Sequence, residues 1–227
     1  MASKYCSLYQ IETHLRDCLT RPLPGSASHL KLSPRPRRGW HPSEIKPGSK
    51  KAAALLLLYP KNDIPHLLLT LRSETLAQHK NQVSFPGGKV ESGESTEEAA
   101  LRETMEEIGV NSKEIRLLGL LSPLYIPVSN FALHPVVGIT HDQQIFSRQK
   151  KEVSRILEVT LQSILSDKYN PRKGFIWRNN TCIHVPYFQL EEERVWGATA
   201  MILSELVDLL GGLVPDPLDQ NVHNANI

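Results

Sequence analysis

One segment, Gly88–Val110, restricts the fold and chemistry of this chain more than any other. It reads GKVESGESTEEAALRETMEEIGV. A helix is predicted over Ser95–Ile108, because Ser95 and Glu98 form a capping-box pattern and Gly109 is a typical helix stop. We therefore expect a glycine-containing loop that leads into a helix rich in glutamate.

The helix is expected to present its glutamates on one side. At 100° per residue, Glu103, Glu106 and Glu107 occupy an arc of about 100°. The opposite, core-facing arc is expected to hold Leu101, Thr104, Met105 and Ile108, while Ala99 and Ala100 leave room for a ligand. A solvated acidic face is the simpler interpretation of three glutamates alone. However, Glu103 and Glu107 repel each other by about 0.2–0.5 kcal/mol, and a bound cation relieves that repulsion. Carboxylate oxygens favour Mg²⁺ or Mn²⁺.

The spacing of fixed residues across the whole segment is a more specific signal than the three glutamates alone. Several positions have fixed identity, and a chance match has a probability of about 10⁻⁸ to 10⁻⁹ per start position. The segment resembles the Nudix box at every position except Thr104, where that family usually has an aliphatic residue. The resemblance implies an α/β fold, the Nudix α/β/α sandwich with a mixed sheet. It also implies a hydrolase that cleaves a nucleoside diphosphate linked to another group.

The resemblance also implies roles for individual residues. The metal would be bound by Glu103, Glu106 and Glu107 with the Gly88 carbonyl. Arg102 and Glu94 would form a supporting ion pair. The general base is left open, because Glu103 fits that role and Glu152, at the start of a predicted strand, resembles an additional ligand or base of many Nudix enzymes.

A second resemblance concerns the substrate. The segment Leu68–Ser73, followed after eleven residues by Phe85–Gly88, is similar to the signature of the coenzyme A diphosphatase branch. This implies CoA or acyl-CoA as substrate. The substrate contacts expected from this signature are Arg72, Ser73, His79, Phe85 and Gly87. The chain departs from the branch at Ala77, usually arginine, and at Asn81, usually glycine.

Two other functions stay open. One is a Nudix hydrolase of ADP-ribose, NADH or a capped RNA end, which the departures at Ala77 and Asn81 keep in consideration. The other is a non-catalytic module that senses a nucleotide, although such a module typically loses metal carboxylates. A basic, Pro-rich stretch between Lys31 and Lys51 fits either a solvated linker or a lip that attracts anions.

The remaining sequence predicts a domain with extensions. Residues 1–50 are expected to form a helix and a basic connection, residues 51–211 the Nudix domain, and residues 212–227 a loose tail. Strands are predicted near 52–59, 66–71, 115–121, 132–140 and 151–157, with a hairpin around Asn179–Asn180. Helices are predicted at 7–20, 160–166 and 197–210. Trp177, Trp196 and Tyr187 are expected more often in the core than stacked on a base.

Composition limits the binding partners and the cellular compartment that we expect for this chain. A net charge of +2 lacks the basic excess of nucleic-acid binders, and we expect no platform of interleaved aromatic and basic residues. Three widely spaced cysteines favour a reducing compartment. No membrane span, secretion signal or Ser-Lys-Leu terminus is apparent, so the cytoplasm or an organelle matrix is expected. The sequence leaves a homodimer open.

Overall fold

The computed structural model describes residues 6–36, 41–74, 80–167, 172–178, 180–211 and 213. Its helices are α1 (Leu8–Cys18), α2 (Ser26–His29), α3 (Thr96–Ile108), α4 (Leu161–Asp167) and α5 (Gly197–Leu210), with a short 3-10 turn at Ser112–Glu114. Its strands are β1 (Lys50–Lys61), β2 (Ile64–Arg72), β3 (Val83–Ser84), β4 (Gly87–Lys89), β5 (Arg116–Leu120), β6 (Leu124–Ile126), β7 (Phe131–Ile139), β8 (Val153–Thr160), β9 (Arg172–Arg178), β10 (Thr181–Leu190) and β11 (Glu193–Trp196).

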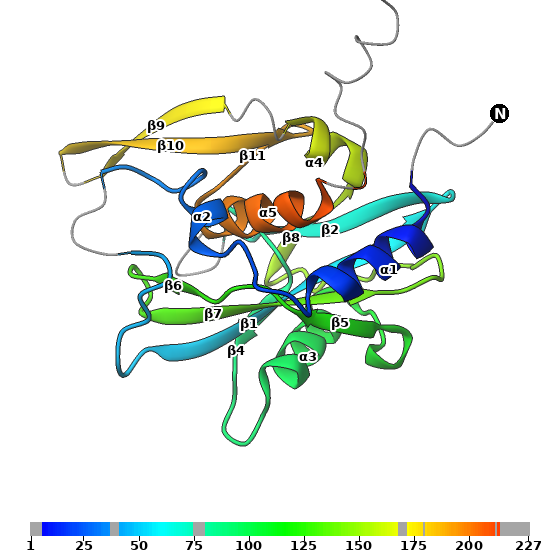
Figure 1. Cartoon of the computed structure of the whole chain (residues 1–227). Coiled ribbons are helices and arrows are strands. Elements are labelled where there is room, and N and C mark those ends of the chain that lie inside the picture. Colours follow the sequence, from blue (N-terminus) through cyan, green and yellow to red (C-terminus); the bar gives the residue numbers. More distant parts are fainter. Residues whose placement is uncertain are drawn as a thin grey trace, which may run out of the picture.

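Strand β1 is the centre of a mixed eight-stranded sheet. It pairs in parallel with β7 and antiparallel with β2 and β4, and the main strand order is β3-β2-β1-β7-β5. Residues 52–59 are all buried, as expected for a continuous apolar strand covered on both faces. Alternate side chains of β1 pack toward α3 on one face and toward α1 and α5 on the other (Figure 1). The predicted sandwich with a mixed sheet is therefore confirmed.

The hairpin between β1 and β2 has a two-residue turn. Lys61 pairs with Ile64, and the intervening Asn62 and Asp63 have φ values of 51° and 62°. Asn and Asp tolerate this left-handed region better than most residues. The turn thereby fixes the register that carries Arg72 to the end of β2.

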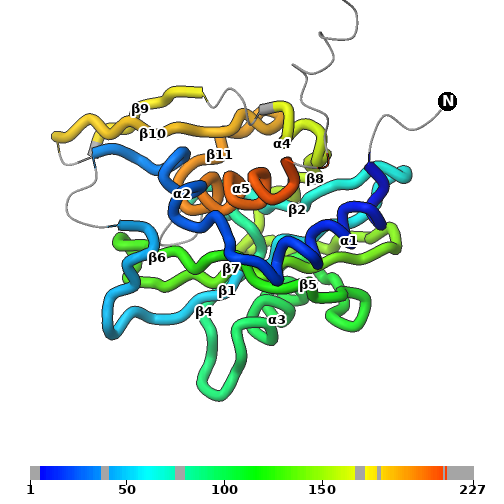
Figure 2. The backbone as a smooth tube through the Cα atoms, in the orientation of Figure 1, coloured from blue at the N-terminus to red at the C-terminus, as the bar shows by residue number. Residues whose placement is uncertain are grey.

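A second sheet, β11-β10-β9, lies beyond α5 from the central sheet (Figure 2). The predicted hairpin around residues 179–180 joins β9 to β10, and Asn180 has a φ of 55°. The N-terminal segment is part of the fold, because Leu8, Ile11 and Leu15 enter the same core cluster as α5.

Several elements were not predicted from the sequence. Among them are α2, β4, β6 and β11, which are four residues long or shorter. Short elements like these give too few residues for a periodic pattern. Within the described residues, no helix has the length and apolarity to cross a membrane.

Candidate active site

Helix α3 begins and ends as its sequence predicts. The Ser95 hydroxyl accepts a hydrogen bond from the Glu98 N–H, and the Glu98 carboxylate accepts one from the Ser95 N–H. Gly109 ends the helix with a φ of 77°, a left-handed conformation that glycine adopts without strain. These caps fix where the glutamates of the last two turns lie.

The orientation of α3 corrects part of the prediction. Ala99 and Ala100 are fully buried against the sheet, so they do not border an open ligand space. Met105, expected in the core, is 52% exposed, whereas Glu107 is only 2% exposed. The small alanines allow a close approach to the sheet, so the buried face is rotated toward Glu107. Thr104 is buried, and its hydroxyl donates to the Ala100 carbonyl.

Two glycines of β4 bring the backbone against the helix carboxylates. The Gly87 N–H donates a hydrogen bond of 3.3 Å to Glu107 Oε2. A Cβ atom at Gly88 would overlap the Glu103 carboxylate, and one at Gly87 would overlap the backbone of Ala53. Only glycine at these positions allows the carboxylates and the β4 backbone to share this space.

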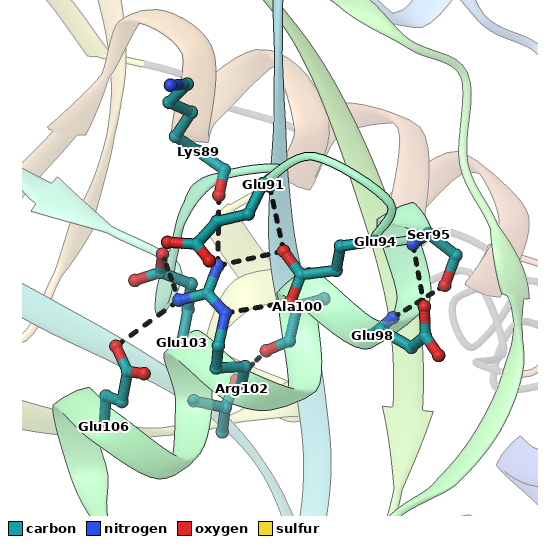
Figure 3. Close-up of polar contacts among 10 residues, drawn as sticks. Lys89, Glu91, Glu94, Ser95, Glu98, Ala100, Arg102, Glu103 and Glu106 are labelled. Atoms are coloured by element: carbon teal, nitrogen blue, oxygen red, sulfur yellow. Dashed lines mark hydrogen bonds and ion pairs between the residues drawn. The ribbon is translucent and has the colours of Figure 1, made fainter.

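Arg102 links the loop to the helix (Figure 3). Its Nε and Nη2 donate to the two carboxylate oxygens of Glu94 at 2.8 and 3.1 Å, a bidentate pair. Nη2 also donates to the Lys89 carbonyl, while Nη1 donates to Glu103 at 2.9 Å and to Glu106 at 3.4 Å. The geometry agrees with the predicted supporting pair, Arg102 and Glu94.

Glu107 is buried and Glu103 is half-buried, and both lie beside other acids. The pKa of Glu107 is raised to about 8, mainly by burial and also by the charges of Glu103 and Glu152, against opposing effects of Arg72 and the Gly87 N–H. Burial also raises the pKa of Glu103, helped by Glu106 and Glu152 and opposed by Arg102. Buried like charges of this kind are costly unless a cation offsets them.

The end of β2 places a second arginine at this site. Arg72 Nη1 lies 3.9 Å from Glu107 Oε1, and Arg72 Nε is buried without a hydrogen-bond partner among the described residues. The Ser73 N–H donates to the Glu152 carbonyl at 2.8 Å. Arg72, Ser73 and Glu152 therefore lie beside the helix glutamates, at the end of β2 and just before β8.

The other predicted substrate contacts have different outcomes. Phe85 is 4% exposed and packs in the core, which leaves its ring little surface to offer a substrate. His79 and Ala77 lie outside the described residues. Asn81 has a φ of 54°, and asparagine tolerates this conformation best after glycine. Its departure from the branch pattern is thus compatible with the backbone that glycine would adopt.

Sequence reasoning missed the loop that supports the far end of α3. The N–H groups of Ser147 and Gln149 donate to the carbonyls of Ile108 and Glu107. The Gln149 carbonyl then accepts from the Glu152 N–H at 3.1 Å. This loop ties Glu152 to the helix terminus. Because these are main-chain bonds between distant parts of the sequence, no side-chain motif indicates them.

The donor set fits a hard divalent cation. Glu103, Glu106, Glu107 and the Gly88 carbonyl offer only oxygen atoms, the ligands that Mg²⁺ and Mn²⁺ prefer. Within the described part of the chain, no three acidic, histidine or cysteine side chains converge as a ready-made ion site. Arg102 Nη1 instead contacts both Glu103 and Glu106. The raised pKa values of Glu103 and Glu107 show that this arginine does not fully compensate the buried acids.

Comparison with known proteins identifies the family. A model of the NUDIX domain matches residues 49–176. The chain belongs to the Nudix family. This Nudix chain is 35% identical over 165 residues to the Uncharacterized Nudix hydrolase NudL of Citrobacter koseri, and the match covers 72% of the chain and 84% of that relative. The protein of the same name from Salmonella paratyphi B is 34% identical over the same shares.

A solved structure shows the same fold. The crystal structure of RenU, a Nudix hydrolase from M. Smegmatis, superposes with a TM-score of 0.52 at 16% identity, covering 82% of this chain and 96% of that one. The protein is accordingly a Nudix hydrolase, an enzyme that cleaves pyrophosphate bonds in nucleoside diphosphate derivatives.

Proposed function

We propose that this Nudix hydrolase cleaves the diphosphate linkage of coenzyme A or acyl-CoA. Water attacks one phosphorus, the bond from phosphorus to the bridging oxygen breaks, and a proton passes to a carboxylate. The products are adenosine 3′,5′-bisphosphate and 4′-phosphopantetheine, or its acylated form. Support for CoA comes from the similarity of Leu68–Ser73 and Phe85–Gly88 to the CoA diphosphatase signature, and from the glycine-like backbone of Asn81.

One observation carries the assignment of roles: Arg72 lies beside the carboxylates, and its buried Nε has no hydrogen-bond partner among the described residues. A guanidinium with an unused donor is suited to a phosphate oxygen. Arg72 would therefore hold the substrate phosphate next to Glu107, with the Ser73 and Gly87 region as further contacts. Contact with a phosphate would also satisfy the donor that is otherwise buried at a cost.

The carboxylates have two tasks in this proposal. A Mg²⁺ or Mn²⁺ ion held by Glu103, Glu106, Glu107 and the Gly88 carbonyl would lower the pKa of a bound water and offset phosphate charge. The proton of the attacking water passes to Glu103 or Glu152, because both lie in the same group of acids. The pair of Arg102 with Glu94 keeps the loop in place.

The test is hydrolysis of CoA beside dephospho-CoA, ADP-ribose and NADH, with Mg²⁺, Mn²⁺ or chelator, and with products identified by mass. We expect metal-dependent release of adenosine 3′,5′-bisphosphate and a preference for CoA over dephospho-CoA. Arg72→Ala should raise KM, whereas the matched control Arg21→Ala, a surface arginine, should not. Preference for ADP-ribose or NADH would overturn the CoA assignment, and unchanged activity in Glu106→Gln would overturn the metal mechanism.

A further inference from the structure

The second sheet extends beyond its shortest strand as a two-stranded ribbon. Strand β9 pairs with residues 181–187 of β10, whereas β11 pairs only with residues 187–190 (Figure 1). The backbone of Arg35 bonds to that of His184 in both directions, at 2.8 and 2.7 Å. We call residues 172–178 and 180–187 the aromatic–basic ribbon.

One face of this ribbon exposes two large aromatic rings. Phe175 is 66% exposed and Trp177 is 76% exposed. They pair with His184 and Cys182, so all four side chains lie on the same face. The expectation that Trp177 packs in the core is therefore wrong, because the ribbon projects past the core residues of the sheet.

The ribbon is also basic and lacks acidic side chains. Residues 172–190 include Arg172, Lys173 and Arg178 but no Asp or Glu. Arg172 and Lys173 are exposed, as is Arg35 beside them. In the described part of the chain, no ion pair involves these three cations. A partner with complementary charge must come from outside the ribbon.

Two kinds of partner fit poorly. A second copy of the ribbon would bring cations against cations, which is unfavourable. A membrane would meet the end of the hairpin at Asn180 and Thr181, which are polar and costly to transfer into lipid. An anionic partner with flat, stackable groups satisfies both the cations and the rings.

We propose that the aromatic–basic ribbon binds single-stranded nucleic acid. Phe175 and Trp177 are two residues apart on a strand, about 7 Å along the chain, and each offers a face to a separate base of an extended strand. Lys173 and Arg35, which the strand register places on the same face as the two rings, contact the phosphates. The local sequence thus interleaves basic and aromatic residues, contrary to our expectation from the sequence. The proposal holds whichever diphosphate the enzyme cleaves.

The test is fluorescence anisotropy of a labelled oligouridylate with the full chain, at low salt and with chelator present, so that the carboxylate site contributes no metal. We expect binding that quenches tryptophan fluorescence. Trp177→Ala and Phe175→Ala should each weaken binding about tenfold, whereas Trp177→Phe should retain most of it. The double variant Arg35→Ala/Lys173→Ala should reduce the salt slope by about 1.4, at about 0.7 per phosphate contact.

The controls are matched residues elsewhere on the surface. Tyr9→Ala removes an exposed aromatic ring on α1, and Lys113→Ala/Lys150→Ala removes two exposed cations; neither should alter binding. The proposal is overturned if oligouridylate does not bind or if Trp177→Ala binds it as wild type does. It is equally overturned if the ribbon variants change only binding to phosphatidylserine vesicles or only the oligomeric state. Hydrolysis of the small substrate should be unchanged in Trp177→Ala, which separates this test from that of the active site.

Discussion

Two groups of buried carboxylates in this protein differ in how they are compensated. One group, Glu103 and Glu107, lies at the active site. The other, Glu12 and Glu205, ties the N-terminal segment to the rest of the fold. All four come from helices, but the pKa values are raised in the first group and lowered in the second.

The N-terminal group is fully supplied with donors. Glu205 accepts from His29 at 2.9 Å, from the Gly25 N–H at 3.0 Å and from the Ser122 hydroxyl at 2.6 Å. Burial opposes ionisation of Glu205, but the bonds from His29 and Ser122 outweigh it and lower the pKa. Glu12 is opposed by burial in the same way, yet bonds from three side chains lower its pKa to about 2; they are His141, Arg16 and Arg116.

The active-site group lacks that supply. Among the described residues, Glu107 accepts one N–H bond, from Gly87, and lies 3.9 Å from an arginine, while Glu103 accepts a side-chain bond from Arg102 alone, at 2.9 Å. A buried charge with its partners in place stabilises a fold, whereas one with partners missing is retained for a ligand. The supply of hydrogen-bond donors therefore distinguishes the structural carboxylates from the functional ones without reference to sequence motifs.

The largest effect on activity is expected when a carboxylate of the active-site group is replaced. Glu107→Gln keeps the side-chain shape and the acceptor for Gly87 but removes the charge. We expect kcat/KM to fall on the order of a thousandfold, because the site loses a metal ligand that supplies several kcal/mol. The unfolding midpoint of the metal-free protein should not fall, and a clear fall would show that Glu107 is structural like Glu205.

Replacing a carboxylate of the N-terminal group should instead lower stability and leave catalysis unchanged. Glu205→Gln replaces one carboxylate oxygen with an amide group that cannot accept a bond from the surrounding buried donors, so the free energy of unfolding should decrease by about 3 kcal/mol or more. Chemical denaturation measures this loss. The folded fraction should keep its catalytic constants; a large fall in kcat with normal stability would contradict the division between the two groups.

The two groups should also respond to pH in opposite directions. The folded pKa of Glu107, about 8, lies above the ordinary 4.5, so metal-free wild type should lose stability as pH rises from 4.5 through 8. The folded pKa of Glu12, about 2, lies below 4.5, so its contribution is full above 4.5 and lost as pH falls toward 2. Each slope is at most about 1.4 kcal/mol per pH unit.

The pH prediction is checked by denaturation across pH with single variants. Glu107→Gln should reduce only the alkaline slope and Glu12→Gln only the acid slope, to which Glu103 and Glu205 also contribute. A variant that leaves its own slope unchanged would show that another group titrates there.

The smallest effect concerns a single bond in the N-terminal group. Ser122→Ala removes one hydroxyl donor to Glu205 but leaves the Ser122 N–H bond and the His29 pair. We expect a loss of about 1 kcal/mol in the free energy of unfolding. A loss as large as that of Glu205→Gln would mean that Ser122, and not His29, is the main partner.

The active site was largely predictable because its information is local. The caps of α3, the pair of Arg102 with Glu94, and the three glutamates all lie within Gly88–Val110. The rotation of α3 about its axis, which buries Glu107 and exposes Met105, was not predictable, because helical spacing alone does not determine which face meets the sheet. Packing against β1 and β4 decides it.

The N-terminal group left no comparable pattern in the sequence. Glu205 lies 176 residues from His29 and 83 from Ser122, so their association depends on tertiary structure. The parallel pairing of β1 with β7 is likewise a long-range contact. By contrast, the hairpin turns at Asn62–Asp63 and Asn180 were predictable, since their residue types favour a left-handed backbone.

The most direct test is the shift of the thermal unfolding midpoint on addition of Mn²⁺ to wild type, Glu107→Gln and Glu205→Gln. If a divalent cation completes the active-site group, wild type should be stabilised by metal. Glu205→Gln should show the same shift from a lower starting midpoint, and Glu107→Gln should show little or none. Equal shifts in wild type and Glu107→Gln would contradict the claim that these buried carboxylates form the metal site.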